Sequence, residues 1–352
     1  MSKWMCLAVV VAACTSSGTP TAVATGQLGA WQAAAPLPVA RANHCSVAID
    51  NWVLAIGGNR SDGSGGFLDT DEIDAAQVAA DGTLGAWQVA GQLPSPGSQS
   101  TCTSDGTTLY VIDGIYDDTT KGSQVWSADL DQTGHLAPLA SLGALPNDTY
   151  AINEAAAVVD GTLYVTTANT PDDTFDPDQT FTIRTPIGGG TPLAWSTDAW
   201  QGVDFRADSE LAFSGDTAYV IGGYHDPAVG AVTDAFVAPI GKDGALGAAS
   251  TTTALPAPVA FGRAAAIDSW LFVVGGRAQV FTGGGSTTIY AAPIAVDGTL
   301  GDWTEPTALS APRTNFALAL VGDVLVLTGG GNGGPGDTTV LVSRARTPVA
   351  PD

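Results

Sequence analysis

The amino-acid sequence predicts an all-β protein made of six copies of one four-stranded unit. A hairpin phrase, "DGTLGAW" at 81–87, returns as "DGTLGDW" at 297–303, and weaker versions keep an interval of 52 to 56 residues along the chain. A double glycine ends an apolar run in most of these units, as in "WVLAIGG" at 52–58. After residue 14, short Val, Ile, Leu and Tyr runs alternate with Gly, Asp and Pro, which is typical of strands and tight turns.

The first unit illustrates how the four strands are expected to follow one another. Asp-Gly between apolar segments predicts a hairpin, because Gly tolerates positive φ and Asp bonds its own backbone. A sheet of about fifty residues cannot bury both faces alone, but such sheets can when they stand radially around an axis, with the Trp of the phrase packed between them. The predicted strands of this unit are 42–49, 52–58, 74–80 and 85–88, with turns at Asp50-Asn51 and Asp81-Gly82.

Three phrases of the unit resemble the kelch repeats of β-propellers, in the form found in secreted bacterial proteins: "LPVAR", "WVLAIGG" and "DGTLGAW". The second and third units have lost one or both glycines, and the other four match well. The resemblance covers residues 25–346 and implies a six-bladed kelch-type β-propeller. The last unit stops after "TTVLVSRA" with no fourth strand, while the chain opens with an extra "GQLGAW". We therefore expect an N-terminal strand to close the last blade and to hide its edge.

The N-terminus is expected to be an export signal. Residues 1–13 contain one basic residue, Lys3, and an apolar run too short to span a membrane. "VAAC" resembles a bacterial lipobox, which implies cleavage before Cys14 and lipid attachment to its sulfur. Residues 14–24 would be a flexible tether, and 347–352 a C-terminal tail. The alternative is ordinary cleavage after Ala24.

Charge and cysteine usage restrict the partners and the compartment. The formal net charge of −23 argues against nucleic acid and against an anionic bilayer bound through charge, since both need a basic surface. Membrane attachment is thus expected through the lipid alone. Cys45 and Cys102 remain in the mature chain, and two buried free thiols are favoured over a disulfide, which stays open.

The candidate binding residues come from comparing the repeats. Arg41, Arg206 and Arg313 each stand sixteen residues before the first glycine of their unit's marker, and Arg263 lies four residues further along its segment. The resemblance to kelch propellers places these segments at one mouth of the central channel. Their guanidinium groups are expected either to hold a carboxylate or to brace neighbouring backbone. The predicted ligand-binding set is Arg41, His44, Arg206, Arg263 and Arg313, with Glu154, Asp208 and Glu210 on the same segments.

No cofactor is expected from the sequence. His44, His135 and His225 fall in three units without metal-ligand spacing, and no copper-oxidase set can be placed. Acidic stretches at 69–74 and 172–178 could hold calcium but lack EF-hand glycine spacing, so solvated loops are favoured. No Ser-His-Asp phrase or phosphate-binding loop is present.

Two functions remain open at this stage. The first is a binding or scaffold module for a protein or carbohydrate, anchored in the bacterial cell envelope (periplasm or outer membrane) or alternatively secreted. Its ligand would lie at the channel mouth or on the loops 59–72, 169–179 and 278–287. The second is a sugar-modifying enzyme, because some bacterial kelch propellers are sialic-acid mutarotases. It would need an acid/base carboxyl group, for which Glu154 and Glu210 are the candidates.

Overall fold

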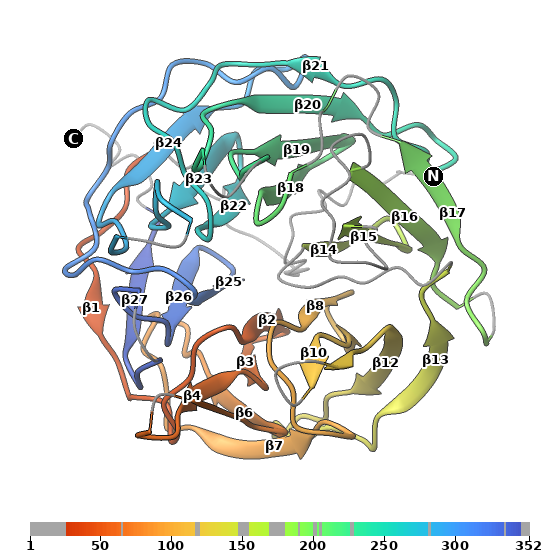
Figure 1. Cartoon of the computed structure of the whole chain (residues 1–352), viewed down its shortest axis with the longest axis vertical. Coiled ribbons are helices and arrows are strands. Elements are labelled where there is room, and N and C mark those ends of the chain that lie inside the picture. The colour runs from red at the N-terminus through yellow and green to blue at the C-terminus, as the bar shows by residue number, and fades with distance from the viewer. Residues whose placement is uncertain are drawn as a thin grey trace.

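The computed structural model forms a six-bladed β-propeller, in which antiparallel sheets stand around a central axis (Figure 1). The fold class predicted from the repeats is therefore confirmed. Regular structure in the described residues consists of strands. The structure describes residues 26–64, 66–116, 120–146, 155–168, 180–188, 191–199, 203, 206–225, 229–280, 283–333 and 336–345.

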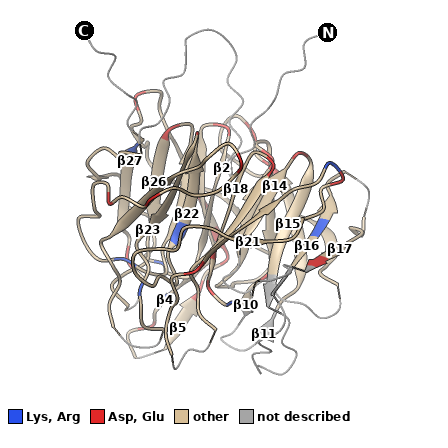
Figure 2. Cartoon of the chain, turned by 90° about the horizontal axis from the view of Figure 1, so that it is seen from above, with Lys and Arg blue, Asp and Glu red and all other residues tan. Residues whose placement is uncertain are grey.

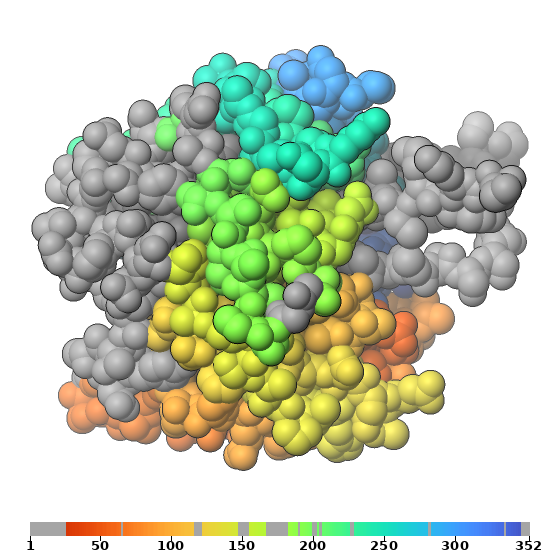
Figure 3. All heavy atoms as spheres, turned by 90° about the vertical axis from the view of Figure 1, so that its right-hand side faces the viewer, coloured from red at the N-terminus to blue at the C-terminus, as the bar shows by residue number. Residues whose placement is uncertain are grey.

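Each blade runs from an inner strand at the axis to an outer strand at the rim, and Figure 3 shows successive blades packed side by side along that rim. Blade 1 contains β2 (Cys45–Ile49), β3 (Trp52–Ile56), β6 (Glu72–Gln77) and β7 (Gln88–Gln92), and blade 2 contains β8 (Thr101–Ser104), β9 (Thr108–Ile112), β12 (Gln124–Asp129) and β13 (Ala140–Ala144). Blade 3 contains β14 (Ala156–Val159), β15 (Thr162–Ala168), β16 (Thr180–Pro186) and β17 (Ser196–Ala199).

The second half of the ring repeats this order. Blade 4 contains β18 (Glu210–Ser214), β19 (Thr217–Ile221), β20 (Ala235–Pro239) and β21 (Ser250–Thr251). Blade 5 contains β22 (Arg263–Ile267), β23 (Trp270–Val274) and β24 (Ile289–Pro293), and its outer edge is formed by a bridge between Ala291 and Thr304. Blade 6 contains β25 (Ala317–Val321), β26 (Val324–Thr328), β27 (Val340–Arg344) and β1 (Gln32–Ala33). Two small hairpins, β4 (Asn59–Ser61) with β5 (Phe67–Asp69) and β10 (Ile115–Tyr116) with β11 (Thr120–Lys121), extend strand 2–3 connections.

The hydrophobic core is divided among the six seams between blades. One cluster joins Leu54 of blade 1 to Val111 of blade 2, and another joins Phe213 of blade 4 to Tyr164 of blade 3. The remaining seams are filled in the same way. Apolar side chains on each sheet are thus shielded from water only because the next blade covers them. One unit alone would leave these side chains exposed and could not fold.

The N-terminal segment closes the ring as predicted. Gln32 and Ala33 of β1 pair with Val342 and Leu341 of β27, so blade 6 takes its outer strand from the other end of the chain. The contact starts earlier, because the Gly29 amide donates to the Arg344 carbonyl at 2.8 Å. Leu28 is only 1% exposed and belongs to the core between blades 5 and 6.

The repeated Asp-Gly phrase forms the turn between the third and fourth strands. In blade 1, Oδ1 of Asp81 accepts the Thr83 amide at 2.9 Å, and Gly82 has a φ of 86° that favours glycine. The Trp87 indole donates to the Ala35 carbonyl beyond β1, and Trp303 makes the equivalent bond to Thr253. The phrase therefore turns the chain, and in blades 1 and 5 its Trp ties the outer strand to the preceding blade.

The fourth strand of blade 1 was placed too early by the sequence. It was expected at 85–88, whereas β7 begins at Gln88. The turn is longer than two residues, since Val78 and Leu84 form an isolated bridge and the Gly85 amide donates to Gln77. Regular pairing between β6 and β7 begins only after Trp87.

The two faces of the ring differ in chemistry. Inner strands begin at one face, the mouth face, from which the β4–β5 hairpin projects (Figure 2). The opposite turn face carries the strand 1–2 and 3–4 turns, and several of its tips are acidic in Figure 2. By strand order, Asp50 and Asp105 lie in strand 1–2 turns, and Asp81 and Asp131 in strand 3–4 turns. Ala345 bonds to Asp323 on this face, so the described chain ends there. Within the described residues, no helix long and apolar enough to cross a membrane is found.

We expect the closure to control stability. Leu28→Ala should lower the free energy of unfolding by about 2–5 kcal/mol, because a fully buried leucine is lost from a closed seam. Chemical denaturation followed by tryptophan fluorescence measures this. The exposed Leu68→Ala is the matched control, with an expected change within about 0.5 kcal/mol. Equal stability of the Leu28→Ala variant and the wild type would contradict a closed ring.

Candidate functional site

Three of the predicted arginines lie inside their own blades. Nη1 of Arg41 donates to the Gly57 carbonyl at 3.0 Å, and the same bond joins Arg206 to Gly222 at 3.2 Å and Arg313 to Gly329 at 2.9 Å. The acceptor is always the first glycine of the double-glycine marker. The marker and the arginine sixteen residues before it are therefore two halves of one structural contact.

Each of these arginines also forms an ion pair with an aspartate of the same blade. Arg41 pairs with Asp74, and neither side chain is exposed. Arg206 pairs with Asp234 at 2.9 Å and lies over the Phe236 ring, and Arg313 pairs with Asp337 at 3.0 Å. Since these guanidinium groups are engaged by carbonyls and carboxylates, they brace the blades. Removing one partner of a fully buried pair such as Arg41–Asp74 typically costs about 3–5 kcal/mol.

Arg263 differs from the other three because it lies on the channel wall. Arg263 lies four residues further along its segment than the other three arginines do, and it is the first residue of inner strand β22. The corresponding first positions in blades 1, 4 and 6 are Cys45, Glu210 and Ala317. Of the predicted arginine set, the structure thus brings Arg263 to the axis beside Glu210.

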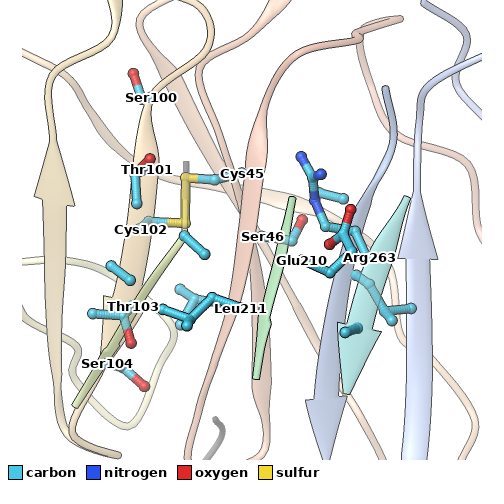
Figure 4. Close-up of a pocket in the computed structure, with 16 residues that line it drawn as sticks. Cys45, Ser46, Ser100, Thr101, Cys102, Thr103, Ser104, Glu210, Leu211 and Arg263 are labelled. Atoms are coloured by element: carbon cyan, nitrogen blue, oxygen red, sulfur yellow. A yellow bond between two sulfur atoms is a disulfide. The ribbon is translucent and has the colours of Figure 1, made fainter. Parts of the chain in front are cut away.

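The channel holds a cavity of about 100 Å³ lined by the inner strands of all six blades. Hydroxyl groups of Ser46, Thr101 and Thr103 line it on the side of blades 1 and 2. Glu210 and Arg263 line it on the side of blades 4 and 5, while Ala and Leu side chains complete the wall (Figure 4). The wall is therefore divided into a hydroxyl sector, a charged sector and apolar sectors.

A disulfide joins Cys45 to Cys102 on the hydroxyl side of this wall (Figure 4). The sequence favoured two free thiols, and this expectation was wrong. The two cysteines occupy non-equivalent positions on β2 and β8, but these inner strands lie next to each other at the axis. Their Cα atoms are 5.9 Å apart, within the range that a disulfide spans. The bond ties two strands that share no backbone pairing.

Glu210 is the most unusual group in the channel. Its side chain is buried, with the residue 5% exposed. The carboxyl group accepts hydrogen bonds from the backbone N–H groups of Gly262 and Ala264 in blade 5, while its Oε1 atom has no hydrogen-bond partner. Burial raises the pKa of Glu210 to about 7, against the lowering effect of the Arg263 charge. A buried carboxyl group with one unsatisfied oxygen and a neighbouring guanidinium is prepared to exchange a proton or a hydrogen bond with a ligand.

His44 lies behind the wall and is 1% exposed. Its Nε2 atom is 2.8 Å from the Thr328 hydroxyl, which is 2.8 Å from the hydroxyl of channel-lining Ser46. Burial, followed by the charges of Arg41 and Arg263, holds the pKa of His44 well below its usual value. The imidazole is thus neutral near pH 7 and reaches the channel only through two hydroxyl groups.

A collar of left-handed residues surrounds the mouth, and sequence reasoning missed it. In blades 1, 2, 4, 5 and 6, one residue has a φ of 49° to 58°, two positions after the position that Arg41 occupies in blade 1. Backbone N–H groups link successive members, with Asn43 donating to Asn315 at 3.1 Å and Gln99 donating to Asn43 at 2.6 Å. Asn and Asp tolerate this conformation best, which was the available sequence signal. The collar residues are Asn43, Gln99, Asp208, Phe261 and Asn315.

The collar is charged between blades 4 and 5. Burial raises the pKa of Asp208 to about 7, against the Arg263 charge and a hydrogen bond from Tyr224. Arg277 lies over the Phe261 ring at 4.2 Å, and Phe261 stacks on Tyr224 with centroids 5.9 Å apart. These contacts pack the rim next to Glu210.

Several predicted residues lie outside the described part of the chain: Cys14, Glu154, and the segments 169–179 and 172–178. The loop 59–72 is described except at residue 65, and it contains the β4–β5 hairpin with exposed Phe67 and Leu68. His135 lies near the turn face, bonded to Thr133. Among the residues that the structure describes, no group of three or more His, Cys, Asp or Glu side chains is arranged to hold a metal ion.

The comparisons with known proteins support the architecture. The solved structure "Structure of YjhT" superposes with a TM-score of 0.63 at 18% sequence identity, covering 88% of this chain and 96% of that one. The chain has the propeller fold of YjhT. No family model and no curated protein matches the sequence. At this identity the likeness to YjhT extends to the fold alone.

The Glu210 carboxyl group should make stability depend on pH. The folded state retains its proton up to about pH 7, whereas the unfolded chain releases it near 4.5, so the folded state binds more protons between these values. The contribution of Glu210 to the unfolding free energy should therefore fall as pH rises through this window, by about 3 kcal/mol in total.

Denaturation curves of the wild type and Glu210→Gln at several pH values measure this difference. The stability of the wild type relative to Glu210→Gln should decline from pH 4.5 to 7 and then level off. The exposed Glu305→Gln is the matched control and should show no such decline. A constant difference between wild type and Glu210→Gln across the window would contradict the assignment.

Proposed function

We propose that the chain is a non-catalytic binding module of the kelch-propeller type, held in the bacterial cell envelope by a lipid on Cys14. Its ligand, a protein segment or a glycan, occupies the channel mouth above Glu210 and Arg263. The collar provides amide groups on the side of blades 6, 1 and 2 and the Asp208 carboxyl group next to Glu210, and the β4–β5 hairpin of blade 1 provides apolar surface on the same face.

One observation carries the proposal. Glu210 is buried and retains an unsatisfied oxygen in a cavity where Arg263 is the only cationic lining residue that the structure describes. Ten buried side-chain atoms of the described residues lack a hydrogen-bond partner, and Glu210 Oε1 is the one that belongs to a residue lining this cavity. A ligand would supply the missing partner, and pockets with a few convergent polar groups are where ligands bind.

The contacts of the other three arginines also support a ligand site at the channel wall beside Glu210 and Arg263. Arg41, Arg206 and Arg313 are occupied inside their blades, so their removal would disturb the fold before it disturbed a ligand. Arg263 makes one backbone contact, to Gly262 at 2.6 Å, and lines the open cavity. Of the arginines first considered for ligand binding, Arg263 is the one we retain.

A second candidate function is sugar modification of the sialic-acid mutarotase type. The observation that favours it is the pKa of Glu210 near 7, which suits a group that both donates and accepts a proton at neutral pH. Arg263 would hold the carboxylate of an acidic sugar beside it. An anomerisation assay with N-acetylneuraminate separates the two functions, since Glu210→Gln should abolish turnover by an enzyme while a binding module shows none.

The binding function is tested with a panel of immobilised glycans and peptides, some of them carrying carboxylates. We expect Glu210→Ala and Arg263→Ala to weaken the binding of the wild-type ligand at least about tenfold, which is 1.4 kcal/mol or more. Arg344→Ala is the control, because it removes the same charge from the distant turn face. Absence of any ligand in the panel, or equal binding by all variants, would contradict the proposal.

The anchor is tested separately on the mature protein. We expect mass spectrometry of the N-terminal peptide to show an acylated Cys14, and Cys14→Ser to release the protein from the membrane fraction. A mature N-terminus at Thr25 would support cleavage after Ala24 and a secreted protein instead. The expected membrane attachment needs no charge contribution from the acidic body.

A further inference from the structure

The size of the channel cavity limits what can enter it. Its volume of about 100 Å³ is smaller than an apolar cavity of about 150 Å³ that accepts benzene. A whole sugar ring with its substituents cannot lie inside. A molecule of about four to six non-hydrogen atoms can, or a single carboxyl group that projects from a larger ligand.

The charged sector of the wall selects the chemistry of that molecule. The Arg263 side chain and the Glu210 carboxyl group lie next to each other in the channel (Figure 4). The protein's own partners of Glu210 are the two backbone N–H groups from blade 5, and its Oε1 atom is unsatisfied. An incoming amine would meet the positive charge of Arg263. An incoming carboxylate would instead find a guanidinium donor and, on a protonated Glu210, an O–H donor.

The opposite wall complements such a ligand. On that wall Ser46, Thr101 and Thr103 offer hydroxyl groups. Between it and the charged sector, Ala156, Ala317 and Leu318 offer apolar contact for a short carbon chain. Hydroxyl groups can donate or accept, so they impose no charge of their own. The cavity is therefore suited to a small molecule with one anionic end and a short, weakly polar remainder.

We propose that the channel binds a small carboxylic acid of about four to six non-hydrogen atoms as its anion, held between Arg263 and a Glu210 that takes up a proton on binding. This inference rests on the proposed binding function and names the ligand class of its deepest part. The only bond formed is the O–H bond of the protonated Glu210, whose proton comes from solvent buffer.

The charged groups around Glu210 support proton uptake on binding. Arg263 on β22 is the nearest cation, and Asp208 before the inner strand of blade 4, whose pKa is also about 7, adds negative charge above that pH. His44 is neutral, and Arg41 is neutralised by Asp74 inside blade 1. Arg277 faces Asp208 across the rim. A second anion beside an ionised Glu210 would be repelled, so binding favours the protonated form.

The experiment is titration calorimetry of acetate into the full mature chain, at pH 6 and pH 8 and in buffers of different ionisation enthalpy. We expect tighter binding at pH 6, with affinity falling up to about tenfold per pH unit above 7, and uptake of up to one proton at pH 8. Glu210→Gln should bind acetate without proton uptake. Arg263→Gln should lose at least about tenfold in affinity, whereas the turn-face control Arg344→Gln should behave as wild type.

The outcomes separate this inference from the proposed function. Acetate binding that is unchanged by Arg263→Gln, or absent from the wild type at both pH values, overturns the small-acid site. A parallel titration with N-acetylneuraminate distinguishes the source of the carboxyl group. Binding of the sugar but not of acetate refutes the inference and leaves a binding function at the mouth. Failure of acetate, the sugar and the whole glycan and peptide panel refutes both.

Discussion

The whole structure depends on one constraint, that each four-stranded sheet has two apolar faces and can cover neither of them itself. Every core cluster between blades therefore combines residues of neighbouring sheets, as Leu54 with Val111 does. A row of sheets would leave a wet face at both ends, and only a ring leaves none. The pairing of β1 with β27 follows from this requirement, since it covers the last exposed edge with the first part of the chain.

The same constraint explains how much of the fold the sequence predicted. Seams recur once per blade, so the residues that build them recur at the same interval, and the double glycines and Asp-Gly turns made that interval visible. Local detail was harder, because the start of β7 depends on where Trp87 contacts the previous blade. The Cys45–Cys102 bond was missed for a similar reason. Sequence position does not tell which residues of adjacent inner strands approach each other.

The candidate site was predictable only in part. The sequence grouped Arg41 and Arg263 as one ligand-binding set, yet their offset of four positions puts one guanidinium inside a blade and the other on the channel wall. The burial of Glu210 and its unsatisfied oxygen depend on backbone groups of Gly262 and Ala264, which belong to the next blade. Such a cross-blade contact has no signature within a single unit.

A repeat protein makes its functional positions visible as departures from its own pattern. The braces and the turns are shared by several blades and therefore account for stability. At the axis, by contrast, the first residue of the inner strand changes from cysteine to glutamate, arginine or alanine around the ring. A closed ring needs no such variety for packing, since small apolar residues would fill the axis equally well. A buried acid beside an arginine costs desolvation energy, and we attribute its presence at this position on the axis to the ligand proposed above.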